Sequence, residues 1–482
     1  MFEDCSFNAV SFKSEAKQTR QSTDGDTQTT PCSVQDAAEQ SREFSSKMVQ
    51  TEEIQPKANV QYDEIKLSEF LKVKYPILIK ELNYPSPLLG KIEDDDNDFS
   101  EKSKKLHEIK SPFKLSRGEY VRVSASVWKK DSNIVCFGYS YDHEDWCCHT
   151  SMVHIYSLNI ANNSQGVTPK VLETPSCITS LQYHPHLPTI LAGAMFNGEI
   201  IVWDLHREEP VITSSASHNK QGNGHKDAIS QISWIRNVDI NQEQPMLVTA
   251  GSDGLMILWH FSPFSCDLSM FARFLLKPPP GIPNKSARNL MYGLYEVDLG
   301  VTSFSFSPHD PKSFIIGMDS GDILKCEITD MYIKQAEREM HILELCPVTG
   351  YYERHNASVT DVKHMKHESG RLQKFITSGV DKVIKIFEEN QDIPLCIFHC
   401  EEVVMGLTFC DIEERVLLAW GSQKLHFFDI YTQELIESPV LGSELRNVRN
   451  TSVSSNRRCI IAMGNSHGIV SIWQITGIIK GE

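Results

Sequence analysis

The segment GEIIVWD at residues 198–204 decides the fold. Its apolar residues follow a small polar start and end in an aromatic side chain, which is typical of a half-buried strand. A second strand-like segment, TILAG at 189–193, precedes it, and Asn197-Gly198 separates the two. Asn-Gly pairs supply the positive φ angles that tight hairpins need. The stretch therefore predicts a hairpin whose last strand ends in Trp203.

The same pattern recurs along the chain from about residue 120 onward. Each copy begins with a small or polar residue, continues through two apolar positions, and ends five positions later in an aromatic residue or, once, a cysteine. A strand that ends near a Pro or a turn precedes each copy. The final positions of the copies are Tyr156, Trp203, Trp259, Cys326, Phe387, Phe428 and Trp473. A strand pattern that recurs at such intervals along the chain indicates the blades of a propeller. We therefore predict an all-β, seven-bladed WD40-type β-propeller, in which 262–292 and 331–354 are long surface loops.

The bulk composition limits the function classes. The chain has 482 residues, 13 cysteines and a formal net charge of −16. An acidic chain is a poor binder of nucleic acid or of anionic membrane surfaces. No apolar run reaches the length of a membrane-spanning helix and no secretory signal opens the chain, so we expect no membrane insertion, a cytoplasmic location and reduced thiols.

Four regions follow from composition. Residues 1–60 are rich in Ser, Thr, Gln and charged residues and are predicted to be a disordered arm. Residues 61–83 predict a short amphipathic helix, 84–114 an acidic linker, and 115–478 the propeller. The apolar stripe of the helix consists of Leu67, Phe70, Leu71, Tyr75, Leu78 and Leu82. Pro76 should kink it. The stripe fits either a partner-binding helix or one that docks on its own propeller.

No catalytic or metal-binding motif is recognisable, and we expect no enzyme activity, cofactor or metal. His143, Cys147, Cys148 and His149 cluster near a hairpin, but their spacing fits no zinc signature, so a hairpin tip is the expectation. Other polar residues within the blades are expected to form structural hydrogen bonds at turns. They are His184, Asp253 and Asp381.

The blades resemble the WD-repeat family. Trp203-Asp204 is an intact WD dipeptide and Gly224-His225 an intact GH dipeptide, while the other copies are degenerate. Some WD propellers serve ubiquitin ligases through a Trp-Asp-x-Arg motif. Here Arg207 stands one position too late, which weakens a ligase-receptor interpretation.

The arm carries a second resemblance. An extended Thr-Gln-Thr segment is similar to the ligands of LC-eight-type dynein light chains, which add a strand to the edge of the light-chain dimer. The candidate residues are Thr27, Gln28 and Thr29, followed by Val49, Gln50 and Thr51. The segment 17–19 is a third candidate. A polar tail can contain one such motif by chance. The prediction therefore depends on the presence of more than one motif in the same arm.

The order of light-chain motifs, helix and propeller resembles the WD-repeat dynein intermediate chains. Within that family the text around 49–52, 61–63, 139–146 and 198–205 is most similar to the smaller type of cytoplasmic dynein-2 intermediate chain. Pro76 departs from the pattern, and residues 1–60 lack the heptads of a coiled coil. The resemblance implies a non-catalytic motor subunit.

That resemblance also implies the partners and the location. They are the dynein-2 heavy chain at the propeller, a second WD-repeat intermediate chain as heterodimer partner, LC-eight-type and roadblock-type light chains, and a Tctex-type light chain as a further candidate. The roadblock-type chain would bind the helix. The location would be the cytoplasm, cytoskeleton and cilium, including the axoneme and the ciliary base or centrosome. Two alternatives remain: an axonemal dynein intermediate chain, and a WD-repeat substrate receptor or peptide-binding scaffold.

Overall fold

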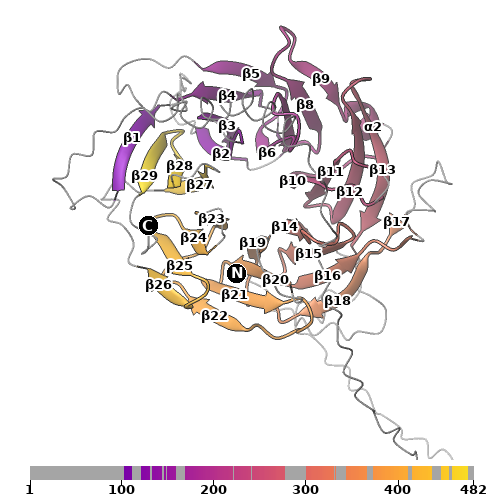
Figure 1. Ribbon diagram of the computed structural model, residues 1–482. Coiled ribbons are helices and arrows are strands. Elements are labelled where there is room, and N and C mark those ends of the chain that lie inside the picture. The colour runs from indigo at the N-terminus through magenta and orange to yellow at the C-terminus, as the bar shows by residue number, and fades with distance from the viewer. Residues whose placement is uncertain are drawn as a thin grey trace, which may run out of the picture. The chain divides into compact units, whose positions relative to one another are not determined.

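The computed structural model describes residues 103–110, 121–130, 133–143, 146–147, 149–158, 169–220, 222–239, 242–276, 300–330, 332, 344–365, 373–410, 415–436, 447–454 and 459–475. The chain has two compact units, residues 1–88 and 89–482, and all described residues belong to the second unit. Within it the described strands form seven sheets, which follow one another around a ring (Figure 1).

The first three sheets, here called blades 1 to 3, succeed one another along the chain. Blade 1 consists of β2 (Val121–Trp128), β3 (Ile134–Tyr141), β4 (Ser151–Ser157) and β5 (Lys170–Thr174). Blade 2 consists of β6 (Ile178–Tyr183), β7 (Ile190–Met195), β8 (Ile200–Asp204) and β9 (Val211–Ser214), and the short helix α2 (Ala216–Lys220) follows it. Blade 3 consists of β10 (Ile229–Ile235), β11 (Met246–Gly251), β12 (Leu255–Ser262) and β13 (Asp267–Leu275), with β17 (Glu344–Leu345) added in parallel at its edge.

The remaining four blades complete the ring. Blade 4 consists of β14 (Val301–Phe306), β15 (Ser313–Met318), β16 (Ile323–Glu327) and β18 (Val348–Tyr352). Blade 5 consists of β19 (Val359–His364), β20 (Lys374–Gly379), β21 (Val383–Glu388) and β22 (Cys396–His399). Blade 6 consists of β23 (Gly406–Phe409), β24 (Val416–Trp420), β25 (Leu425–Asp429) and β26 (Glu434–Ile436). Blade 7 consists of β27 (Val448–Val453), β28 (Cys459–Asn465), β29 (Val470–Ile475) and β1 (Ser103–Ile109).

The predicted seven-bladed propeller is confirmed. Every aromatic or cysteine position that ended a sequence copy lies on the third strand of a different blade. The predicted hairpin turns are confirmed as well, because Gly198 and Gly254 have φ angles of 77° and 72°. Those angles lie in the region that favours glycine.

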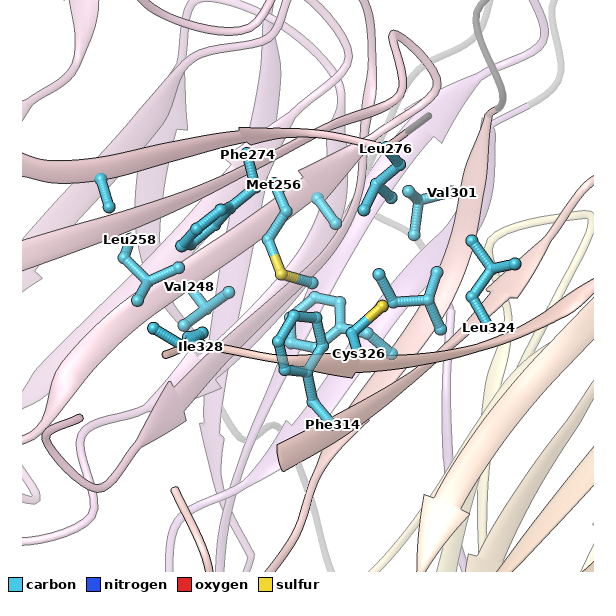
Figure 2. Packing of buried hydrophobic residues seen from close by; sticks show 14 of the residues in the cluster. Val248, Met256, Leu258, Phe274, Leu276, Val301, Phe314, Leu324, Cys326 and Ile328 are labelled. Atoms are coloured by element: carbon cyan, nitrogen blue, oxygen red, sulfur yellow. The ribbon is translucent and has the colours of Figure 1, made fainter. Parts of the chain in front are cut away.

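The core is divided among the junctions between blades. The described residues form seven hydrophobic clusters, and each cluster combines residues from two adjacent blades. Figure 2 shows the junction of blades 3 and 4, where Met256 and Phe274 face Phe314 and Cys326. A further cluster joins blade 7 to blade 1, so the ring is closed by the same packing that holds its other blades together.

Polar side chains on the inner strands also join the blades. The Gln182 Oε1 atom of blade 2 accepts a hydrogen bond from the backbone N–H of Trp234 in blade 3 at 2.7 Å. Gln231 of blade 3 likewise accepts from the N–H of Phe304 in blade 4 at 2.7 Å and donates to its carbonyl oxygen at 3.1 Å. These bonds satisfy backbone groups that face another sheet and fix the register between neighbours.

β1 corrects the prediction of a linker over 84–114. This strand pairs antiparallel with β29, from Ser103 opposite Ile475 to Ile109 opposite Val470. Leu106 and Ile109 pack against the cluster between blades 7 and 1. The linker was predicted because most residues around Leu106 and Ile109 are charged or polar. These two apolar side chains are nevertheless enough to pack one side of an edge strand against the blade.

The predicted loops over 262–292 and 331–354 are also wrong in part. β13 lies within the first range, and β17 and β18 lie within the second. β13 was missed because it is an outer strand in which exposed positions such as Asp267 alternate with buried ones such as Leu268 and Phe274. Among the described residues, no helix has the length and apolar character needed to cross a membrane.

Candidate functional sites

The light-chain and helix residues predicted from sequence lie outside the described residues. They are the segments 17–19, 27–29 and 49–51 and the whole helix 61–83 with Pro76. The candidate sites described below therefore all belong to the propeller.

Blade 3 contains a buried chain of polar groups. The indole N–H of Trp259 donates to the Thr249 hydroxyl at 3.0 Å, and this hydroxyl lies 2.8 Å from Nε2 of His225. The His225 Nδ1 atom lies 3.1 Å from Asp253, whose carboxylate also accepts the backbone N–H of Leu255 at 3.1 Å. An indole can only donate, so the Thr249 hydroxyl can donate onward to neutral His225, and its Nδ1–H then donates to Asp253. The network ties the turn between β11 and β12 to the segment before β10.

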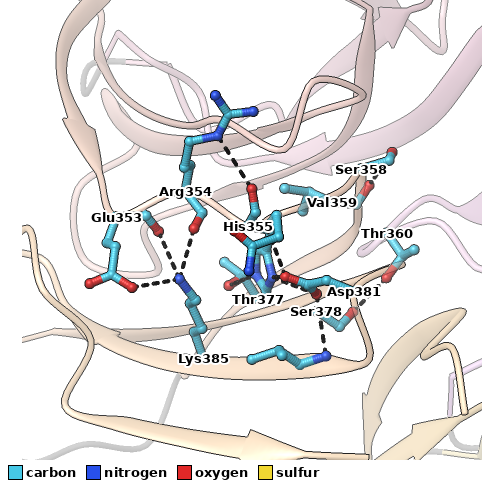
Figure 3. Close-up of polar contacts among 12 residues, drawn as sticks. Glu353, Arg354, His355, Ser358, Val359, Thr360, Thr377, Ser378, Asp381 and Lys385 are labelled. Atoms are coloured by element: carbon cyan, nitrogen blue, oxygen red, sulfur yellow. Dashed lines mark hydrogen bonds and ion pairs between the residues drawn. The ribbon is translucent and has the colours of Figure 1, made fainter. Parts of the chain in front are cut away.

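Blade 5 repeats the network without its last member, as Figure 3 shows. The His355 Nδ1 atom lies 3.0 Å from Asp381, and Nε2 lies 2.9 Å from the Thr377 hydroxyl. The position of Trp259 is taken by Phe387, which has no N–H group. Beside the network, Lys385 donates to a carboxylate oxygen of Glu353 at 2.8 Å. Burial lowers the pKa of His355, and the nearby Asp381 charge opposes that effect.

These Asp–His–Thr groups have the residue types of a hydrolytic triad, but their setting excludes that chemistry. The side chains of His225 and His355 are fully buried, and those of Asp253 and Asp381 are 6% and 8% exposed. A nucleophile must meet its substrate and a base must reach it. The prediction that Asp253 and Asp381 are structural is therefore confirmed.

His184 is confirmed as a structural residue by its own turn. Its Nδ1 atom accepts the backbone N–H groups of His186 at 3.2 Å and Leu187 at 2.9 Å. Burial, with a smaller contribution from His186, lowers the pKa of His184 to about 4. The neutral imidazole is the form that can accept both hydrogen bonds, so this turn depends on His184 remaining unprotonated.

A group of histidines and cysteines lies where blade 1 meets blade 2. The potential ligand atoms of His143, Cys147, His149 and Cys177 all lie within 4.8 Å of one another. The first three come from the connection between β3 and β4, and Cys177 directly precedes β6. Sequence spacing grouped the first three with Cys148 and missed Cys177. The local signal does not contain it, because Cys177 reaches the group only through the packing of two blades.

The two thiols of this group differ in their acidity. Burial alone would raise the pKa of Cys147, but the polar groups around it, with Ser176 and the backbone of Cys177 first among them, lower it to about 6. Burial raises the pKa of Cys177 to about 11. The site thus favours a thiolate at Cys147 near neutral pH, next to a second sulfur that is held as a thiol when no cation is present.

Apolar side chains are exposed along the outer rim of blades 5 and 6. In β22 half-buried and exposed residues alternate, and the Ile397 side chain is 44% exposed. The other large exposed side chains of this rim are Ile393, Leu395, Tyr431 and Leu435. Exposed apolar side chains on neighbouring blades are candidates for a protein–protein contact. We call these five residues the outer-rim patch.

The fold and its buried His–Asp turns define a WD-type β-propeller, a class of domain that commonly serves as a binding platform. No family model matches the chain. The chain is 24% identical over 478 residues to cytoplasmic dynein 2 intermediate chain 2 of Mus musculus, covering 93% of this chain and 84% of the relative. The same comparison with the Homo sapiens protein gives 24% over 433 residues, 86% of this chain and 77% of the relative.

A more distant relative is the dynein axonemal intermediate chain 4 of Danio rerio, which is 22% identical over 376 residues, 74% of this chain and 42% of the relative. These three relatives are all dynein intermediate chains, and the two dynein 2 proteins cover most of this chain.

Proposed function

We propose that the chain is a non-catalytic intermediate chain of the cytoplasmic dynein-2 motor, which supports retrograde intraflagellar transport and cilium assembly. The observation that carries this proposal is the length of the similarity. It covers 84% of the length of a dynein-2 intermediate chain, whereas it covers 42% of the length of the axonemal relative. The buried state of both His–Asp pairs supports a binding role over a catalytic one.

In this proposal the propeller binds the dynein-2 heavy chain. The arm binds LC-eight-type light chains through 27–29 and 49–51, and the helix 61–83 binds a roadblock-type light chain. A second intermediate chain and a Tctex-type light chain complete the assembly. Two weak tethered contacts in one arm act together through effective concentration, so paired light-chain motifs suit a bivalent light-chain dimer. The chain would then be found in the cytoplasm and at the base and shaft of cilia.

Affinity purification of the tagged full chain from cells with a non-motile primary cilium tests the motor assignment. The expected result is recovery of the dynein-2 heavy chain. Recovery of an axonemal heavy chain from motile cilia instead would support the axonemal alternative. Recovery of no dynein heavy chain from either source would remove the motor assignment and favour a substrate receptor or peptide-binding scaffold.

The arm is tested with paired substitutions. Gln28→Ala with Thr29→Ala, combined with Gln50→Ala and Thr51→Ala, should lose the LC-eight-type light chain and keep the heavy chain. Gln18→Ala with Thr19→Ala is measured in parallel and tests whether 17–19 is also a site. Unchanged light-chain recovery in the combined variant would remove these motifs as the binding residues.

Deletion of 63–83 tests the helix separately. The deleted protein should lose the roadblock-type light chain and keep the LC-eight-type chain. A roadblock-type chain that still co-purifies would favour the alternative in which the helix docks on its own propeller.

The outer-rim patch is our proposed contact for the heavy chain. Burial of an exposed leucine or isoleucine contributes about 1.5–3 kcal/mol. Leu395→Ser with Ile397→Ser should therefore weaken heavy-chain recovery at least tenfold, while light-chain recovery stays unchanged. Val171→Ser with Val211→Ser is the matched control, because these exposed valines lie on the outer strands of blades 1 and 2. Equal recovery with both double variants would place the contact elsewhere.

A further inference from the structure

The connection between β3 and β4 differs from the equivalent turns of the neighbouring blades. It spans residues 142–150, whereas the β7–β8 and β11–β12 turns span only 196–199 and 252–254. The short turns are closed by a glycine with a positive φ angle. The long connection of blade 1 instead carries three members of the group, His143, Cys147 and His149. A hairpin connection of this length needs another source of order.

Two aromatic side chains hold the imidazoles of this connection in place. The ring of His143 stacks on Phe196 of blade 2, with centroids 4.1 Å apart and planes inclined by 10°. The ring of His149 stacks on Tyr141 of blade 1, at 4.7 Å and 22°. Both nitrogens of His143 are buried, and neither has a hydrogen-bond partner among the described residues. A buried imidazole without a partner is costly unless a further group binds it.

Cys177 is fixed by both blades. Its sulfur accepts the backbone N–H of Tyr141 in blade 1 at 3.4 Å. Its carbonyl oxygen accepts the backbone N–H of Phe196 in blade 2 at 2.9 Å. The sulfur is thereby held within 4.8 Å of the ligand atoms of His143, Cys147 and His149. Such backbone contacts are the outer support that orients a metal ligand.

We propose that His143, Cys147, His149 and Cys177 bind a structural zinc ion that joins blade 1 to blade 2. Two thiolates and two imidazoles are a closed four-ligand set for Zn²⁺. Zinc bonds of about 2.3 Å to sulfur and about 2.0 Å to nitrogen place tetrahedral neighbours about 3.3–3.8 Å apart. The Cys147 Sγ and His149 Nδ1 atoms are 4.0 Å apart, so small side-chain rotations complete the geometry.

The chemistry of the set favours zinc over the other occupants. Binding releases the proton of the remaining thiol, and the charges of two buried sulfur ligands neutralise the cation. Four protein ligands leave no open position for substrate, so the ion would be structural. The main rival is a disulfide between Cys147 and Cys177, which would need an oxidant and would leave both histidines without a role. The proposal stands independently of the motor assignment.

The test uses the full chain, purified under reducing conditions, dialysed against a weak chelator and analysed for metals by plasma mass spectrometry. The expected result is about one zinc per chain. His149→Ala should lose that zinc, and it should leave the fold intact because His149 is exposed. Cys177→Ser should lose it as well. Cys326→Ser is the matched control, since Cys326 is a free, buried cysteine far along the chain in blade 4.

A second measurement separates the outcomes. Co²⁺ added to the metal-free protein should give the visible bands of a tetrahedral sulfur-ligated site, and His149→Ala should weaken them while Cys326→Ser keeps them. Zinc removal should lower the thermal midpoint of the wild type and leave that of His149→Ala unchanged. The proposal is overturned if zinc is absent from the wild type, if the ligand variants retain it, or if peptide mapping finds a Cys147–Cys177 disulfide in place of the metal.

Discussion

Blade 3 and blade 5 contain the same buried His–Asp turn, but they support it in different ways. In blade 3 the chain of hydrogen bonds continues from Thr249 to the indole of Trp259. In blade 5 it stops at Thr377, and Phe387 stacks on Phe375 with centroids 5.1 Å apart. The His–Asp pair is thus the shared part of the network and the tryptophan an extension of it. A blade can exchange the last hydrogen bond for aromatic packing.

The largest expected effect is the loss of the shared part. Asp253→Ala and Asp381→Ala each leave a buried histidine and backbone N–H groups without an acceptor. Removing one partner of a buried pair costs about 3 kcal/mol or more. The two variants should lower the free energy of unfolding by similar amounts, measured by urea denaturation of the full chain. If the loss in the free energy of unfolding for one variant is less than about half of the loss for the other, the two pairs are not equivalent.

Removing the threonine hydroxyls should separate the two blades. Thr249→Val leaves both the Trp259 indole N–H and the Nε2 atom of His225 without a partner, whereas Thr377→Val leaves only the Nε2 atom of His355. Each unsatisfied buried group costs about 1 kcal/mol or more. We expect a loss of about 2 kcal/mol in blade 3 and about 1 kcal/mol in blade 5. Equal losses, measured in the same denaturation experiment, would mean that the indole hydrogen bond contributes nothing.

The turns of the two blades differ at one backbone position. Gly254 of blade 3 has a φ angle of 72°, and Lys382 of blade 5 has 65° at the equivalent place. Gly254→Ala should cost about 1 kcal/mol, because a Cβ is strained in this region. Lys382→Gly should change the stability by less than about 0.5 kcal/mol, since relief of strain is offset by the greater freedom of unfolded glycine. Thermal midpoints check both values, and a large loss with Lys382→Gly would give that lysine a role of its own.

Acid should have a smaller effect than the loss of a buried hydrogen bond. Burial lowers the pKa of His184 from 6.5 to about 4, so the unfolded state binds more protons than the folded state between these values. Stability therefore rises with pH across that window and is lost as the pH falls from about 6.5. His184 alone should remove about 0.7 kcal/mol between pH 7 and pH 6.

His184→Asn keeps an acceptor for the turn but does not titrate. Its stability should fall less steeply between pH 7 and pH 6 than that of the wild type, and His355, whose pKa burial also lowers, should account for part of the remaining slope. An unchanged slope in His184→Asn would contradict this assignment.

Much of the fold is predictable from the sequence because the third strands are buried on both faces. The motif ending at Trp203 recurs wherever such a strand must pack between two blades, so all seven copies could be found. The outer strands could not. β9 and β26, for example, have mostly exposed or half-buried side chains, so their sequences carry little apolar periodicity.

The WD dipeptide itself proved a weaker guide than the turn histidines. Trp203 belongs to the intact dipeptide, yet its indole N–H has no hydrogen-bond partner among the described residues. The position equivalent to Thr249 is Gly193, where a Cβ would lie 2.7 Å from the Trp203 ring. The GH dipeptide did mark His225, but His355 follows Arg354 and lacks that signal. Which network a blade uses depends on pairs of positions that lie more than 20 residues apart.

The pairing of β1 with β29 also has a consequence for synthesis. Ser103 and Ile475 are partners in one sheet but lie about 370 residues apart in the chain. At translation rates of about 5–20 residues per second, β1 leaves the ribosome about 20 s or more before its partner strand exists. During that interval its hydrogen-bonding edge has no native partner and is open to wrong pairing. A chaperone or an early-binding subunit that shields residues 103–109 would therefore act on the yield of closed rings more than on their final stability.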